Sequence, residues 1–151
     1  MQKSEYIHKS HNVPILLYHL VFPAKYRKVV IDEKVDRTIK DVCIDISYRY
    51  QIHFLEIGTD KDHVHFLIQS VPTYNVTKLV TIIKSITARE IFKRNPEVKQ
   101  KLWGGEFWTD GYFANTVSRF GDEATISEYV KKQGTKKDYK ILHKINQLAL
   151  F

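Results

Sequence analysis

The segment 62–69, Asp-His-Val-His-Phe-Leu-Ile-Gln, constrains the fold of this chain more than any other. It is a largely apolar run that predicts a β-strand, and successive side chains of a strand point to opposite faces. His63 and His65 then project together from one face. The other face carries the apolar residues of the strand, Val64, Phe66 and Ile68. An apolar run at 52–57 and a turn at 58–62 precede the segment, so we expect a β-hairpin.

The spacing of apolar residues elsewhere predicts an α+β domain. The expected elements are strands at 15–22 and 111–118 and helices at 32–50, 75–94 and around Tyr129. This order, β-α-β-β-α-β-α, is that of a ferredoxin-like (RRM-like) antiparallel sheet with helices on one face. The histidine pair should lie on the face that these helices leave open. A short further helix is expected within 138–151, with no chemistry assigned to it.

Length and charge limit the classes of function. The 151 residues suit a single domain, with a core at roughly 13–135 and a tail at roughly 136–151. The net charge of +7 favours a polyanionic partner, most simply nucleic acid. Neither a signal sequence nor a membrane span is expected, because no apolar run approaches the roughly 18 residues that a span needs. The single cysteine, Cys43, lies on an apolar helical stripe, and a reducing cytoplasm is the expected location.

Two imidazoles on one strand face form half of a metal site. A divalent ion held by His63 and His65 could polarise a phosphate. Two histidines at this spacing also occur as packed residues of a half-buried strand, and the strand alone does not distinguish the two interpretations.

A second fragment, late in the chain, offers the missing chemistry. Tyr129 and Gln133 are four residues apart on an expected helix, so they are neighbours on one helix face, with Lys132 beside them. A tyrosine can act as a nucleophile, and the carbonyl oxygen of a glutamine can be a metal ligand. The same pattern also suits a tyrosine packed against the domain and a solvated pair of lysines.

Together these fragments resemble the single-tyrosine HUH transposases of bacterial insertion sequences, the TnpA type that mobilises single-stranded DNA. His63-Val64-His65 matches the HUH motif, and Tyr129 with Gln133 matches the tyrosine and glutamine of the family. The segment from His19 to Arg27 is similar to the family's first strand and its basic exit. The segment Trp103 to Phe113 is similar to its aromatic and glycine-rich stretch.

The resemblance implies a metal-dependent DNA strand transferase. Tyr129 would be the nucleophile, and His63, His65 and Gln133 would hold Mg²⁺ or Mn²⁺. The DNA would be cut through a 5′-phosphotyrosine at insertion-sequence ends, which are recognised by their hairpins. A homodimer is implied, in which the tyrosine helix of one subunit can complete the site of the other. The candidate phosphate contacts are Lys25, Arg27, Lys84, Arg89, Lys131 and Lys132. His19 and Glu56 could lie near the site, although a structural role is the simpler expectation for both.

Other classes fit less well. A histidine-triad nucleotide hydrolase would need a third histidine at position 67, which is Leu67. A non-catalytic RNA- or DNA-binding module of the same topology should carry a basic residue, a glycine and an aromatic on the central strand, and 62–66 does not. A domesticated hairpin-binding relative that no longer cuts remains the alternative to an active transposase.

Overall fold

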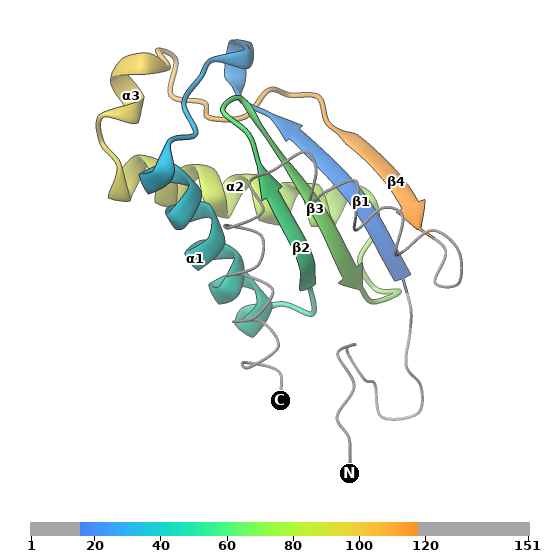
Figure 1. Cartoon of the computed structure of the whole chain (residues 1–151). Coiled ribbons are helices and arrows are strands. Elements are labelled where there is room, and N and C mark those ends of the chain that lie inside the picture. Colours follow the sequence, from blue (N-terminus) through green and yellow to red (C-terminus); the bar gives the residue numbers. More distant parts are fainter. Residues whose placement is uncertain (1–15, 118–151) are drawn as a thin grey trace.

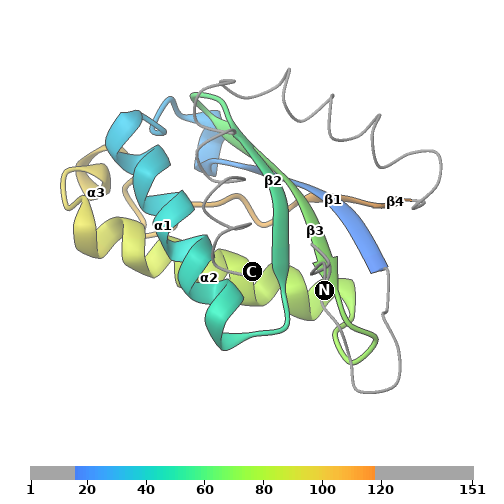
Figure 2. The same ribbon diagram turned by 60° about the horizontal axis from the view of Figure 1, so that its bottom comes forward.

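A four-stranded antiparallel sheet with the strand order β2-β3-β1-β4 forms one layer of the protein (Figure 1). The computed structural model describes residues 16–117. Its strands are β1 (Leu16–Pro23), β2 (His53–Thr59), β3 (His63–Ser70) and β4 (Phe113–Val117). Its helices are α1 (Glu33–Arg49), α2 (Val76–Arg94), the short α3 (Val98–Lys101) and the 3-10 turn η1 (Lys25–Arg27). Figure 2 shows α1 and α2 together on one side of the sheet, which confirms the predicted ferredoxin-like arrangement.

A side chain caps the N-terminus of each long helix. Asp32 accepts a hydrogen bond from the backbone N–H of Val35 at 2.9 Å, and Asn75 accepts one from Lys78 at 2.7 Å. These bonds satisfy donors that the first helical turn leaves without partners. α2 ends at Arg94, immediately before Asn95-Pro96, because proline cannot continue the hydrogen-bond ladder.

The strands match the expected elements but differ at their ends. β2 runs two residues further than predicted, to Thr59, and β4 is shorter, at Phe113–Val117. β2 and β3 form the expected hairpin, with a register shift between Phe54 and Glu56. The extra residue at this bulge is Leu55, which belongs to an apolar cluster that also contains Leu67.

The main core lies between the sheet and the two long helices. The ring of Phe66 contacts those of Phe22 and Phe54 there, at centroid distances of 5.2 and 5.7 Å. Cys43 is buried in the same core, as predicted from its place on the apolar stripe. None of the helices in the described part of the chain is long and apolar enough to cross a membrane. The expected helices around Tyr129 and within 138–151 lie outside the described residues.

Candidate active site

His63 and His65 lie side by side on β3, on the face of the sheet opposite the helices. The intervening Val64 belongs to the helix-side core, so the alternation predicted from the sequence is present. The two imidazole centroids are 4.9 Å apart and their planes are 71° from parallel. The His63 side chain is 14 % exposed, whereas His65 is buried. The strand therefore presents two ring nitrogens to one small region above the sheet.

Asp62 fixes the hydrogen on the first of these rings. Its Oδ1 lies 2.7 Å from Nδ1 of His63, and a carboxylate can only accept, so Nδ1 donates. Neutral His63 then carries its lone pair on Nε2. Arg27 donates from Nε to the other oxygen of Asp62 at 3.1 Å. The hydrogen bond from His63, reinforced by that from Arg27, lowers the pKa of the Asp62 carboxyl against the opposing effect of burial.

His19, on β1, makes the corresponding contact to the second ring. Its Nε2 lies 3.1 Å from Nδ1 of His65, and the two ring planes are within 14° of parallel. The centroids are 5.4 Å apart. The centroids are far apart although the two nitrogens are only 3.1 Å apart, so each nitrogen must lie on the side of its ring that faces the other ring. Burial is the main cause that lowers the pKa of His65 to about 3, and burial also lowers the pKa of His19. Both rings are therefore neutral near pH 7.

The turn after β1 holds Arg27 in reach of Asp62. Tyr26 and Arg27 both have left-handed backbone angles, with φ of 59° and 52°. Such angles are unfavourable in residues with a side chain and persist only where the surroundings enforce them. Here the backbone N–H of Ala24 donates to the carbonyl of Asp62 at 2.8 Å. The β1 exit is thus bonded to the β2-β3 turn by both backbone and side chain.

The same face of the sheet carries further buried groups. Leu17, Leu55, Leu67 and Val117 form a small apolar cluster there. The ring of Phe113 meets His19 edge-on at 5.8 Å. Glu56 is buried opposite Leu67. Within residues 16–117 no cluster of three or more His, Cys, Asp or Glu side chains could hold a metal ion, so the histidine pair alone is not a complete site.

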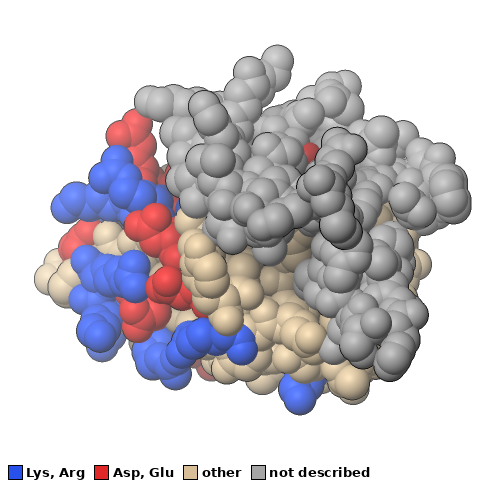
Figure 3. All heavy atoms as spheres, turned by 90° about the horizontal axis from the view of Figure 1, so that it is seen from below, with Lys and Arg blue, Asp and Glu red and all other residues tan. Residues whose placement is uncertain are grey.

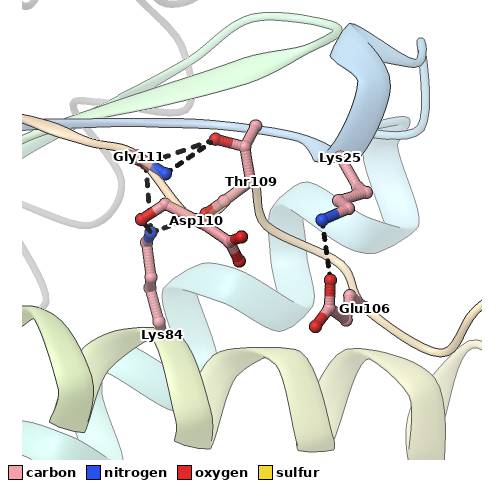
Figure 4. Close-up of polar contacts among 6 residues, drawn as sticks. All are labelled: Lys25, Lys84, Glu106, Thr109, Asp110 and Gly111. Atoms are coloured by element: carbon pink, nitrogen blue, oxygen red, sulfur yellow. Dashed lines mark hydrogen bonds and ion pairs between the residues drawn. The ribbon is translucent and has the colours of Figure 1, made fainter.

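Three of the predicted phosphate contacts, Lys25, Arg27 and Lys84, bind protein groups, and Figure 4 shows the partners of Lys25 and Lys84. The ammonium of Lys84, on α2, donates to the carbonyls of Thr109, Asp110 and Gly111 at 2.7, 3.2 and 3.1 Å. Burial lowers the pKa of Lys84. These bonds tie the approach to β4 to α2, and the DNA contact of Lys84 stays a prediction.

The other predicted cations within residues 16–117 differ in their surroundings. Lys25 forms an ion pair with Glu106 at 2.7 Å (Figure 4), and the hydrogen bond in this pair raises the pKa of Lys25. Arg27 is bound to Asp62, and Arg89 is exposed on α2, in the helix layer away from the histidine pair. On the face shown in Figure 3, Lys and Arg lie beside Asp and Glu instead of gathering into one basic patch.

Part of the predicted site cannot be placed. Tyr129, Gln133, Lys131 and Lys132 lie outside the described residues. Sequence reasoning did not single out Asp62, although its position directly before the motif was a signal. It named His19 only as a residue that could lie near the site. The contact of His19 with His65 depends on the β1-β3 register, in which Val21 pairs with His65 and His19 with Leu67.

Comparison of the whole chain with known proteins finds similarity to transposases. The family model of IS200-like transposases matches residues 12–133. The ISDra2 transposase TnpA of Deinococcus radiodurans is 34% identical over 121 residues, which cover 80% of this chain and 86% of the relative. A crystal structure of a protein described as a transposase, from Deinococcus radiodurans R1, has a TM-score of 0.65 and 32% identity to this chain. The match covers 85% of this chain and 98% of that one. The fold is also shared with a REP-associated tyrosine transposase bound to a REP hairpin, with a TM-score of 0.56 and 12% identity over 89% of this chain and 74% of that one.

Proposed function

This chain belongs to the family of IS200-like transposases, and from that premise we propose that it cuts and rejoins single-stranded DNA at insertion-sequence ends. Membership implies DNA strand transfer. The proposal adds the mechanism, a 5′-phosphotyrosine intermediate on Tyr129 formed at a metal site that includes His63 and His65.

The observation that carries the proposal is the histidine pair itself. The centroids of its two rings lie 4.9 Å apart on one strand, and the Nδ1 hydrogen of His63 is directed to the carboxylate of Asp62. An imidazole oriented in this way by a second side chain is the usual arrangement of a metal-binding histidine. Neutral rings are also required, because a protonated imidazole cannot bind a cation. The lowered pKa of His65 meets that requirement.

The residues present fit a divalent ion, with Gln133 as the expected third ligand. The two imidazoles alone would suit transition metals, whereas an oxygen ligand and water admit Mg²⁺ or Mn²⁺, the ions we propose. When bound, such an ion would polarise the scissile phosphate and offset its negative charge.

Tyr129 would supply the nucleophile. Its phenolic oxygen gives its proton to water and forms a bond to phosphorus, while the bond from phosphorus to the 3′-oxygen breaks. That oxygen leaves with the bonding pair and takes up a proton, for which Lys132 is the candidate donor. The downstream DNA is then joined to Tyr129 through its 5′-phosphate. A 3′-hydroxyl can later displace the tyrosine and rejoin a strand without ATP, because each step exchanges one phosphoester for another.

We propose single-stranded DNA hairpins at the element ends as the bound form of the substrate, and a homodimer as the active assembly. The net charge of +7 supports binding to a polyanion. The REP-associated transposase, whose fold this chain shares, is bound to a hairpin. Binding should weaken with salt, with a log-log slope of about −0.7 per neutralised phosphate on single strands. Equal affinity for a perfect duplex of the same sequence would contradict hairpin recognition.

A labelled-DNA cleavage assay tests the mechanism. Wild-type protein, Mn²⁺ and a hairpin substrate labelled at its 3′ end should give an SDS-stable labelled protein, whereas a 5′ label should run as a short free product. Tyr129→Phe removes one oxygen and should abolish the adduct with little change in hairpin affinity. A Tyr129→Phe protein that still forms the adduct would move the nucleophile to another tyrosine. Tight hairpin binding by the wild type without any adduct would favour a domesticated, non-cutting relative.

A further inference from the structure

His19 is a polar side chain beside the histidine pair that the proposed mechanism does not use. It lies on β1, is 4 % exposed, and directs Nε2 at Nδ1 of His65 from 3.1 Å. Its neighbours on the strand, Tyr18 and Leu20, face the helix-side core instead. A buried polar ring placed against a predicted metal ligand calls for a specific role.

The contact has only two possible arrangements of hydrogen. A neutral imidazole has one N–H and one lone pair, so a nitrogen-to-nitrogen contact of this length holds a single hydrogen. In the first arrangement, Nδ1 of His65 donates to Nε2 of His19, and the lone pair of His65 is on Nε2. In the second, Nε2 of His19 donates, and the hydrogen of His65 moves to its own Nε2. Only the first leaves His65 able to bind a metal through Nε2.

The two histidines of the pair differ in how this choice is made. Asp62 cannot donate, so its contact alone fixes the hydrogen of His63 on Nδ1. His19 can either donate or accept, so its own tautomer decides whether His65 is a ligand. This difference makes His19 more than a packing residue.

We infer that His19 is a positioning residue: it accepts the Nδ1 hydrogen of His65 and holds His65 in the tautomer that presents Nε2 to a divalent metal ion. The inference rests on the proposed metal-dependent function. It adds a residue 46 positions away from His65 in the chain, on a different strand, to the machinery of the site. Outer-shell partners of this kind typically change metal affinity by roughly 10- to 100-fold when they are lost.

The first test needs no variant and no metal. In the full-length protein labelled with ¹⁵N, long-range ¹H–¹⁵N correlation spectra at pH 7 distinguish protonated from bare ring nitrogens. We expect a protonated Nδ1 and a bare Nε2 on His65, with a bare Nε2 on His19. A protonated Nε2 on His65 would overturn the inference.

The second test uses Mn²⁺ binding measured by calorimetry. His19→Leu removes the acceptor and should weaken Mn²⁺ binding by about 10- to 100-fold. His19→Gln offers a side-chain oxygen as an acceptor and should restore the affinity to within a few-fold of the wild type. His53→Leu is the matched control, since His53 is a buried histidine that pairs with Gln69, roughly 13 Å along β3 from His65. It should leave the affinity unchanged.

The outcomes separate this inference from the proposed function. Mn²⁺ binding and adduct formation by the wild type, with the same Mn²⁺ affinity in a folded His19→Leu protein, would overturn the role of His19 alone. A wild type that neither binds Mn²⁺ nor forms an adduct would overturn both. If His19→Leu fails to fold, the tautomer spectrum of the wild type and the Mn²⁺ affinity of His19→Gln still decide whether His19 positions His65.

Discussion

The two faces of β3 are built from alternate residues of one strand, yet they are held by different interactions. On the helix side, Val64, Phe66 and Ile68 are each 0% exposed and pack in the apolar core. On the other side, His63 and His65 are held by directional contacts of 2.7 and 3.1 Å to Asp62 and His19. Apolar packing depends on volume, whereas these contacts depend on the position of single hydrogens. Stability and chemistry can therefore be altered separately from neighbouring positions, and the following predictions test that separation.

The largest effect on stability is expected from Phe66→Ala. The ring contacts both Phe22 and Phe54, so its removal leaves a cavity in the main core. We expect the free energy of unfolding to fall by about 3–5 kcal/mol. Chemical denaturation measures this directly. A loss below about 1 kcal/mol, within the range of ordinary substitutions, would mean that the helix side is not the main source of stability.

His63→Ala and His65→Ala should instead remove activity. Each deletes a metal ligand of the proposed site, and we expect metal-dependent cleavage to fall by more than about 100-fold, beyond the effect of losing an outer-shell partner. The free energy of unfolding should fall by only about 1 kcal/mol, with the larger loss for the more deeply buried His65. If both variants unfolded, and the fraction that stayed folded still cleaved hairpins fully, the two histidines would serve packing and not metal binding.

Lys84→Met tests a cation on the helix side. It removes three bonds to the carbonyls of 109–111 while keeping much of the apolar stem. We expect a loss of about 2 kcal/mol in the free energy of unfolding, in the range measured for a hydrogen bond to a charged group. The salt dependence of hairpin binding should not change. If the log-log salt slope of hairpin binding became shallower by the equivalent of one phosphate, Lys84 would be a DNA contact.

The buried imidazole of His65 should also appear in the pH dependence of stability. In the unfolded chain it takes up a proton near its ordinary pKa of 6.5, but in the folded protein only near a pKa of about 3. Between these values the unfolded state binds more protons, so the free energy of unfolding should fall as the pH is lowered. Other groups titrate in the same range, so the measurement is the difference between wild type and His65→Asn. The wild-type curve should be steeper; parallel curves would contradict burial of a neutral ring.

The smallest effect is expected from Arg27→Gln. Arg27 is 61 % exposed, and an exposed ion pair contributes about 0.2–1 kcal/mol. Because Asp62 retains its contact to His63, we expect Mn²⁺ affinity to change by no more than a few-fold. Asp62→Asn should have the larger effect, since an amide can donate to His63 as well as accept. Equal losses of affinity in both variants would show that Arg27 and Asp62 act as one unit.

Local signals predicted the elements, but not the contacts between them. Both long helices were predicted from the spacing of apolar residues within each segment, a pattern that needs no distant contact. The bulge at Phe54–Glu56 and the left-handed pair Tyr26–Arg27 carry no glycine, and therefore lacked the usual signal of an unusual backbone.

Lys84 shows the limit of reading one helix alone. The sequence offered it as one of six candidate phosphate contacts, and did not show that a segment 25 to 27 residues later folds back to meet it. The same holds for His19, whose place beside His65 depends on the register of two strands far apart in the sequence. The pair His63 and His65 was predictable because its geometry depends only on the alternation within one strand.

The separation of 46 residues between His19 and His65 also determines the order in which the site can form during folding. A hairpin such as β2-β3 closes in roughly 1–10 μs, whereas docking β1 must first close a loop that contains all of α1. His63 and His65 should therefore become neighbours before His19 reaches them. We expect Mn²⁺ added early in refolding to bind weakly, and tight binding to develop only with the slower docking of β1. Stopped-flow mixing with Mn²⁺ at increasing delays measures this, and tight binding at the shortest delay would mean that the hairpin is sufficient.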